Sequence, residues 1–379
     1  MKIATIKGIE IKLHLSTLVI VGLVGFYAGL QYYQLTLNLN WFILTVVGLI
    51  TGVIMLLSIL IHELMHSLVA QRHGLKVSEI EFYMFGGVSN IEEEPRTPSS
   101  EIIISAVGPL SSLIIGAAFL AAYFLPLQVF NIPLPPELIV VLSYTGFSNV
   151  ILAGFNAIPA FPLDGGRILR AYLWRKRNNL ISATRTASKV GNYFGLALIG
   201  FGFLEIIFFL TLGGFWLIII GMFLRSSANK AFQMTLYEVK LSKLGAREVM
   251  RPPQNLIPND ISVEKAIREY FMKYKSSYFP VSNDNKKIIG LLTLNELRNI
   301  PRNRRREYIV EYAMKRISTF PSIKEDETGK EAFKKLNQEE IEPKIVVVKD
   351  PNDNIQGFIG EKEISSALQI SDLIFEDFS

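Results

Sequence analysis

An apolar run over residues 41–70 constrains this chain most, because it is long enough to cross a bilayer and carries an H-E-x-x-H motif. On a helix, His62 and His66 stand four positions apart and project from the same face. Two imidazole nitrogens placed in this way can hold one Zn²⁺, and Glu63 beside them can act on a metal-bound water. Ionisable side chains are costly in lipid and usually functional there, so the run predicts a zinc site at membrane depth.

Charge divides the chain into two parts. Residues 1–230 carry 15 Lys+Arg and 11 Asp+Glu, whereas residues 231–379 carry 24 and 23. We therefore predict a membrane domain at residues 1–230 and a soluble module at residues 246–370. The small net charge of +5 lies mostly in the first part, where it indicates topology in a lipid bilayer and no nucleic-acid partner.

The absence of cysteine from the chain excludes disulfides, thiolate metal ligands and a catalytic thiol. Any zinc must therefore be held by His, Asp or Glu. Lys2, Lys7 and Lys12 precede the first apolar stretch without a clear small-residue cleavage site, so we predict a first membrane helix and not a removed signal peptide.

Apolar segments predict about six transmembrane helices followed by the soluble α/β module. The segments lie near residues 13–30, 41–70, 101–125, 138–158, 190–210 and 212–224. Gly213-Gly214 is expected to form the turn between the last two. Glu205 lies in the fifth segment, where it either faces water or pairs with Arg185.

The charges of the connecting loops predict the topology. The link 31–40 carries no charged residue, and the link 126–137 carries a single Glu. The N-terminus and the stretches after the second, fourth and sixth segments are basic. Six spans bring all the basic stretches to one side, as the positive-inside rule expects. We predict a multi-pass protein of the cell membrane with its N-terminus and soluble module in the cytoplasm.

A proline-rich run, residues 156–167, ends the fourth segment. In this topology it reaches the same depth as the H-E-x-x-H motif. Pro159 and Pro162 prevent an unbroken helix, and non-helical backbone at that depth is tolerated only where protein or a watery cavity covers it. Asp164 is therefore expected to face an internal site that water can reach.

The two motifs together resemble those of the site-2 protease family of intramembrane zinc metalloproteases. The matching parts are H-E-x-x-H and the N-x-x-P-x-x-P-L-D-G-G run at residues 156–166, with Gly108-Pro109 and residues 7–14 in support. The resemblance covers residues 1 to about 225. The soluble part matches the subgroup of this family that carries C-terminal CBS domains.

The resemblance implies regulated intramembrane proteolysis, in which a transmembrane protein is the substrate. It assigns His62, His66 and Asp164 as zinc ligands, Glu63 as general base and Asn156 as the residue that holds the substrate carbonyl or its oxyanion. Three protein ligands leave zinc an open position for water. Zinc lowers the pKa of that water toward about 7, Glu63 takes its proton, and an amide suits the oxyanion.

The segment from Ser78 to Ser89 combines strand-forming residues with a glycine pair. In the family this region is an edge at the membrane surface. Our hypothesis is that an unwound substrate pairs with it as an added strand. The acidic run Glu92-Glu93-Glu94 follows it, and fits either a solvated loop or a substrate gate.

An internal repeat divides residues 246–370 into units at about 246–300 and 310–370. Each unit is predicted to form a helix, two strands and a helix, which is the order of a CBS motif. Two such motifs pair into one module. Modules of this kind often bind adenosine nucleotides and form homodimers, so both are expected partners. A purely structural or dimerising pair is the alternative.

The nucleotide contacts that the CBS resemblance implies are Thr293, for phosphate, and Glu296, which replaces the usual Asp. The matching positions of the second unit are Gly360 and Glu363, so the hydroxyl is missing there.

Two other classes remain open from the sequence: a CBS-regulated membrane transporter or channel, and an inactive protease-like scaffold. A transporter should keep transport after Glu63→Gln, whereas a protease should lose cleavage. Intact ligands and an intact base speak against the scaffold.

Overall fold

The computed structural model describes residues 1–37, 39–83, 86–91, 94–209, 213–283, 287–338 and 343–374. The chain forms two compact units, Met1–Phe232 and Gln233–Ser379. One continuous helix, α7 (Gly213–Ser242), runs through the boundary between them.

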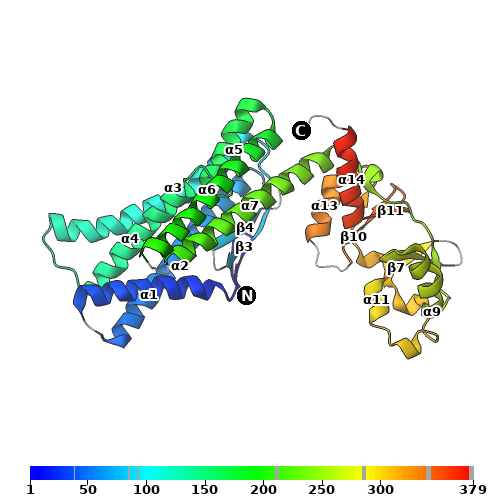
Figure 1. The fold of residues 1–379 in the computed structure, drawn as a ribbon, viewed down its shortest axis with the longest axis horizontal. Coiled ribbons are helices and arrows are strands. Elements are labelled where there is room, and N and C mark those ends of the chain that lie inside the picture. The colour runs from blue at the N-terminus through cyan, green and yellow to red at the C-terminus, as the bar shows by residue number, and fades with distance from the viewer. Residues whose placement is uncertain are drawn as a thin grey trace. The chain divides into compact units, whose positions relative to one another are not determined.

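Long helices make up most of the first unit (Figure 1). They are α1 (Thr17–Thr36), α2 (Trp41–Arg72), α3 (Pro98–Phe124), α4 (Pro136–Asn156), α5 (Asp164–Arg177), α6 (Leu180–Phe209) and α7. A π-helical turn, Leu125–Val129, extends α3. Among the described residues, five helices are long and apolar enough to cross a membrane: α1, α2, α3 with its π-helical extension, α4 and α6.

Three boundaries differ from those expected. The first span begins at Thr17, because the residues before it form strands. Helix α6 begins at Leu180, well before the predicted segment 190–210. Gly213 already belongs to α7, which contains the sixth predicted segment but is not among the five spans, since polar residues fill its second half.

The predicted alternative in which Glu205 pairs with Arg185 is wrong. Both residues lie on α6, twenty positions apart, which at 1.5 Å per residue separates them by about 30 Å. The Arg185 guanidinium lies over the ring of Phe232 on α7 instead, 5.8 Å from its centroid.

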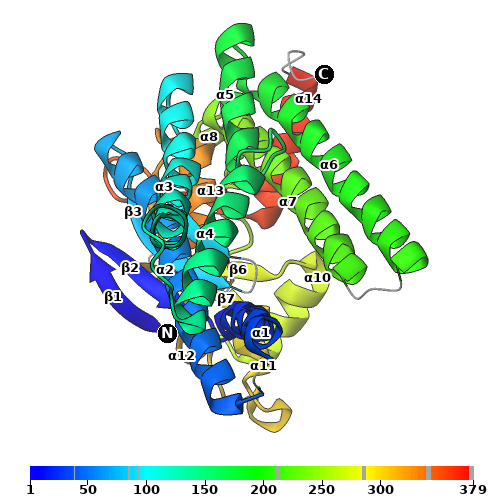
Figure 2. The same cartoon turned by 90° about the vertical axis from the view of Figure 1, so that its left-hand side faces the viewer.

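Glycines allow two antiparallel helix pairs to pack closely. A Cβ atom on Gly48 of α2 would lie 2.4 Å from the carbonyl oxygen of Gly25 on α1. On α6 and α7, Gly202 packs on Gly214 in the same way, and Figure 2 shows these two helices side by side. Small residues at such crossings let membrane helices approach through their backbones.

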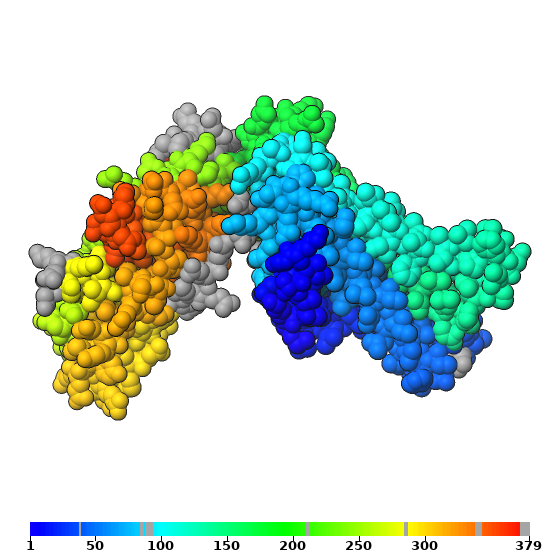
Figure 3. All heavy atoms as spheres, turned by 180° about the vertical axis from the view of Figure 1, so that it is seen from behind, coloured from blue at the N-terminus to red at the C-terminus, as the bar shows by residue number. Residues whose placement is uncertain are grey.

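A four-stranded sheet in the order β1-β2-β3-β4 completes the first unit. Its strands are β1 (Lys2–Ile6), β2 (Ile9–Leu13), β3 (Val77–Tyr83) and β4 (Gly86–Ile91). Strand β2 pairs parallel with β3, and the other pairs are antiparallel. One face packs on α2 through Ile11, Ile80 and Phe82. Strand β1 is exposed along its whole length, and Figure 3 shows the N-terminal residues at the surface.

This sheet contains the predicted strand-forming segment and its glycine pair. Residues 84, 85, 92 and 93 lie outside the described part of the chain, and with them most of the acidic run. Strand β4 pairs with β3 and stands at the end of the strand order, so it is an edge strand.

The second unit contains two small sheets with short helices between the strands. One sheet has the order β5-β6-β7-β8 and the other β11-β10-β9. The strands are β5 (Ile257–Pro258), β6 (Tyr278–Ser282), β7 (Ile288–Thr293), β8 (Lys315–Arg316), β9 (Ser322–Lys324), β10 (Ile345–Lys349) and β11 (Ile355–Gly360). The helices after α7 are α8 (Ala246–Val249), α9 (Val263–Ala266), α10 (Met272–Tyr274), α11 (Leu294–Arg298), α12 (Val310–Ala313), α13 (Gly329–Gln338) and α14 (Glu361–Ile374), with a π-helical turn at Ile267–Phe271 and 3₁₀ turns at Arg302–Arg304 and Ile317–Thr319.

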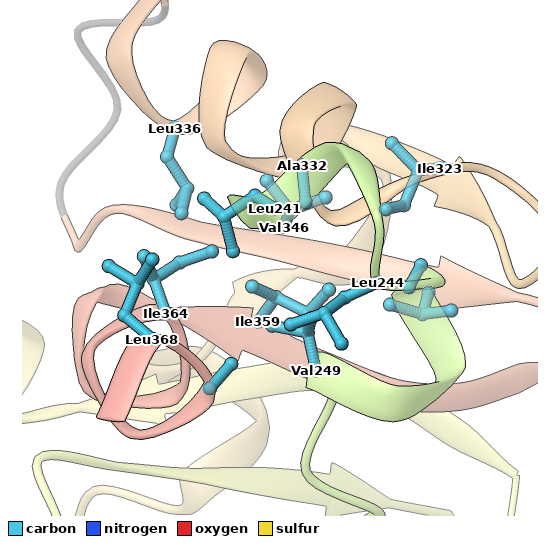
Figure 4. Packing of buried hydrophobic residues seen from close by; sticks show 13 residues of the cluster. Leu241, Leu244, Val249, Ile323, Ala332, Leu336, Val346, Ile359, Ile364 and Leu368 are labelled. Atoms are coloured by element: carbon cyan, nitrogen blue, oxygen red, sulfur yellow. The ribbon is translucent and has the colours of Figure 1, made fainter. Parts of the chain in front are cut away.

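The end of α7 is part of the core of this unit. Leu241 packs with Val346 of β10, Ile359 of β11 and Ile364 of α14 (Figure 4). Tyr237 stacks edge-on against Phe333 of α13, with ring centroids 6.1 Å apart. The helix that leaves the first unit is therefore a structural element of the second.

Candidate metal centre

Both histidines of the H-E-x-x-H motif lie on the inward face of α2. His62 and His66 are 4% and 5% exposed, and Met55 and Ser58 are buried on the same side of the helix. Asn40 begins this helix by accepting hydrogen bonds from the N–H groups of the first turn. The spacing of four residues places the two imidazoles one above the other, as predicted, with ring centroids 4.8 Å apart.

Asp164 meets the two histidines from another helix. It is the first residue of α5, and its carboxylate is buried. Its Oδ2 atom lies 3.3 Å from Nε2 of His62 and 3.2 Å from Nε2 of His66, and the two Nε2 atoms are 3.2 Å apart. Three donor atoms from two distant motifs thus converge on one point inside the first unit.

These separations fit a tetrahedral zinc ion. Zinc bonds to His nitrogen and carboxylate oxygen are about 2.0–2.2 Å long, which in a tetrahedron places neighbouring donors about 3.3–3.6 Å apart. Two histidines and one carboxylate leave a fourth position for water, as in catalytic zinc sites. The donor set therefore fits the metal that the motif predicts.

Helix α3 orients both imidazoles through their other nitrogens. Nδ1 of His66 lies 2.6 Å from the carbonyl oxygen of Ile104, and Nδ1 of His62 lies 2.9 Å from Oγ of Ser112. A carbonyl only accepts, so Nδ1 of His66 donates and its Nε2 keeps a lone pair directed at the centre. Sequence reasoning missed Ile104 and Ser112; their spacing around Gly108, four residues to either side, is the signal that marks this face of α3.

Gly108 gives the centre its room. A Cβ atom at this position would lie 2.0 Å from Nε2 of His66 and 2.8 Å from Nε2 of His62. Any side chain here would occupy the space between the histidines and α3. The Gly108-Pro109 pair that supports the family resemblance is therefore explained by a steric requirement.

Glu63 lies next to the edge strand. It follows His62 on α2 and is half-buried. A Cβ atom on Gly87 of β4 would lie 2.5 Å from its Cγ atom, so the strand packs directly against the Glu63 side chain. The structure therefore brings the predicted base and the predicted substrate-pairing strand together.

Asn156 ends α4 and is half-buried. Its Nδ2 atom donates to the carbonyl oxygen of Leu152, 3.1 Å away. This bond lies within α4, so the amide has to turn from it to reach a substrate.

The structure places the two expected CBS contacts, Thr293 and Glu296, beside each other. Thr293 is buried and its hydroxyl is hydrogen-bonded to the Glu296 carboxylate, which also pairs with Lys315 at 3.3 Å. A pocket of about 360 Å³ nearby lies within the second unit and is lined by residues of both halves of the internal repeat: Ser277, Tyr278, Asn295, Pro343, Lys344, Ile345, Gly360, Glu361, Lys362 and Glu363.

Burial and the Glu363 carboxylate raise the pKa of Tyr278 above its usual range, so its hydroxyl stays protonated even in alkaline solution, where an ordinary tyrosine ionises. Tyr278 therefore presents a neutral hydroxyl in this pocket, beside the charged Lys344 and Lys362.

Comparison with known proteins identifies both units. Residues 50–134 and 126–201 match peptidase family M50, and residues 246–302 match the CBS domain. Rip3 of Mycobacterium tuberculosis, named as a candidate zinc metalloprotease, is 31% identical over 312 residues, which cover 79% of this chain and 76% of that protein. The zinc metalloprotease MJ0392 of Methanocaldococcus jannaschii is 27% identical over 97% of this chain and 96% of that protein.

A solved structure, the site-2 protease from Methanocaldococcus jannaschii, is 30% identical and covers 61% of this chain and 94% of that one, with a TM-score of 0.41. The identity with Rip3 over most of both chains establishes the family. The chain belongs to peptidase family M50, the site-2 proteases, and is a membrane-embedded zinc metalloprotease with a C-terminal CBS domain.

Proposed function

We propose that this metalloprotease hydrolyses a peptide bond in or near a transmembrane segment of a membrane protein. The observation that carries the proposal is the convergence of His62, His66 and Asp164, whose donor atoms lie 3.2–3.3 Å apart inside a unit built of membrane-length helices. A peptide bond has to reach this buried position from within the membrane or its surface. Such access fits a transmembrane substrate better than a soluble one.

Each polar group has a distinct role in this reaction. His62, His66 and Asp164 would hold the zinc, and bound zinc would supply a water of lowered pKa and polarise the scissile carbonyl. Glu63 takes a proton from the attacking water and returns it to the leaving amine. Asn156, once its amide turns from the bond to Leu152, donates to the oxyanion.

The edge strand β4 is the proposed substrate platform. Its outer edge is available in the strand order, and Gly87 is in contact with Glu63. An unwound substrate segment that pairs with β4 would therefore lie beside the base. Gly86→Pro should lower cleavage by disturbing this strand, and full activity in that variant would count against strand addition.

Cleavage of single-span model substrates in proteoliposomes tests the main proposal. Wild-type protein should cut them only when zinc is present, and Glu63→Gln should not. Efficient transport with no cleavage, unchanged by Glu63→Gln, would favour a CBS-regulated transporter. Folded protein that binds zinc but neither cleaves nor transports would favour the inactive scaffold.

The second unit is proposed to regulate this activity through a weakly bound adenosine nucleotide. A pocket of about 360 Å³ is within the range of small-ligand sites, and lysines beside a tyrosine hydroxyl suit phosphate and ribose. Because α7 ends in the core of this unit, binding there has a covalent route to the membrane domain. Calorimetry that shows no heat with AMP, ATP or S-adenosylmethionine would contradict nucleotide binding by this unit.

The topology and the assembly state are part of the proposal. We propose that the apolar first half of α7 supplies a sixth crossing, so that the N-terminus and the CBS module both lie in the cytoplasm, on the side of the basic loops. Pairing of CBS modules is proposed to make a homodimer. Protease protection of tagged termini in sealed vesicles tests the sidedness. The molar mass of the detergent-solubilised protein tests the dimer.

A further inference from the structure

A buried arginine outside the ligand set joins the elements that surround the metal centre. Arg170 lies on α5, six positions after Asp164, and its side chain is only 3% exposed. Its Nε atom donates to Oε1 of Glu101 at 2.6 Å, and Nη2 pairs with the same oxygen. Nη1 donates to Oε1 of Glu94 at 3.2 Å. Glu101 is in the first turn of α3, and Glu94 lies in the connection between β4 and α3.

The same guanidinium packs on the loop that leads into Asp164. Its central carbon lies 5.2 Å from the ring centroid of Phe161, a favourable cation–π distance. A Cβ atom on Gly166 would lie 2.2 Å from the backbone nitrogen of Phe161, so this loop packs tightly against the first turn of α5. Arg170 thus contacts the loop that precedes Asp164, through the ring of Phe161.

Glu101 connects the pair to the histidines. It is fully buried and precedes Ile104 by three residues on α3, and the carbonyl of Ile104 fixes His66. Its Oε2 atom is buried and has no hydrogen-bond partner among the described residues. A carboxylate removed from water is tolerated only when it is paired, so Glu101 depends on Arg170.

We propose that Arg170 is a positioning residue for the metal centre, a conclusion that rests on the proposed zinc-dependent function. Its pair with Glu101 holds α5 against α3 at the spacing that brings Asp164 to the histidines. Its bond to Glu94 anchors the connection that follows the substrate strand. A planar guanidinium presents its donors in a fixed fork and a flat face to a ring, whereas a lysine ammonium is a compact charge without that fork.

The test is the zinc dissociation constant of the full-length, detergent-purified protein, measured by competition with chelators. Arg170→Met and Glu101→Gln are each expected to raise this constant roughly 10- to 100-fold, the usual cost of losing a residue that orients metal ligands. The double variant should be no worse than the poorer single variant, because both remove one contact. Arg175→Met, at an exposed position of the same helix, is the matched control and should leave the constant unchanged.

Glu94→Gln tests the second contact separately. It should leave zinc affinity unchanged and raise KM for a model substrate severalfold with little effect on kcat, because Glu94 follows the substrate strand. Weaker zinc binding in this variant would contradict the separate roles of the two carboxylates.

Folding is controlled by thermal melting of every variant. If Arg170→Met does not fold, Arg170→Lys keeps the charge without the fork and should raise the zinc dissociation constant to a smaller extent. Folded Arg170→Lys and Glu101→Gln that bind zinc as wild type does, even with lower melting temperatures, would overturn the positioning role. Folded wild type that binds no zinc would instead overturn the proposed function.

Discussion

Gly108 faces His66 so closely that a Cβ atom on the glycine would lie 2.0 Å from the imidazole Nε2. The methyl group of Gly108→Ala therefore has to displace either α3 or the imidazole. Zinc affinity is expected to fall by at least tenfold, since ligand geometry is disturbed. Gly154→Ala on α4 is the control, because a Cβ atom there meets nothing within 4 Å. Equal zinc affinity in the two variants would contradict the steric role of Gly108.

Asp164→Ala should remove one of three ligands and release zinc. Near-stoichiometric metal is expected in wild-type protein purified without chelators, and a small fraction of it in the variant, measured as zinc per polypeptide. Asp353→Ala, at an exposed position in the second unit, should keep the wild-type content. Retained zinc in Asp164→Ala would contradict the assignment of Asp164 as a zinc ligand alongside His62 and His66.

Glu63→Gln should leave zinc bound and abolish cleavage. The amide has nearly the same volume as the carboxylate but cannot take a proton, so the loss falls on general base catalysis, worth roughly 10²- to 10⁴-fold. Zinc content and kcat are measured on the same preparation. Loss of zinc together with activity would show that Glu63 supports the fold of the centre.

Gly87→Ala should reduce kcat more than zinc affinity. Its Cβ atom would lie 2.5 Å from Cγ of Glu63, so the base has to move, whereas the three atoms nearest to that Cβ belong to Glu63 and Phe82 and none to a zinc ligand. A variant with weakened zinc and an unchanged kcat per bound zinc would contradict this assignment. The measurements are the zinc dissociation constant and kcat per bound zinc, for wild type and for Gly87→Ala.

Thr293→Ala and Lys344→Met should affect different properties of the second unit, its stability and its nucleotide binding. Thr293 caps α11, so its loss should lower the free energy of unfolding by about 1 kcal/mol. Lys344 lines the pocket, so its loss should weaken nucleotide binding with little effect on stability. Calorimetry and thermal melting of both variants make the comparison. Loss of nucleotide heat in a folded Thr293→Ala would favour the phosphate contact that the CBS resemblance implies.

The sequence by itself determined the class of the protein and predicted which residues form its centre. A motif of His62, Glu63 and His66 on a membrane-length apolar run needs only helical periodicity to place two imidazoles on one face. The prolines before Asp164 predicted that it faces an internal site, and the family resemblance implied its role as the third ligand. The charge change near residue 230 separated the membrane part from the CBS part. All of these are local properties of the chain.

Only the tertiary structure decided which parts of other elements meet this centre. Helix α3 contacts the two histidines because it crosses α2, and no local pattern encodes this crossing. The contacts are made by the carbonyl of Ile104, the hydroxyl of Ser112 and the space left at Gly108. The pair of Arg170 and Glu101 joins residues 69 positions apart in the chain. A buried charge requires a partner of opposite charge. Which residue supplies it depends on which helix faces pack together, and local sequence patterns do not specify that packing.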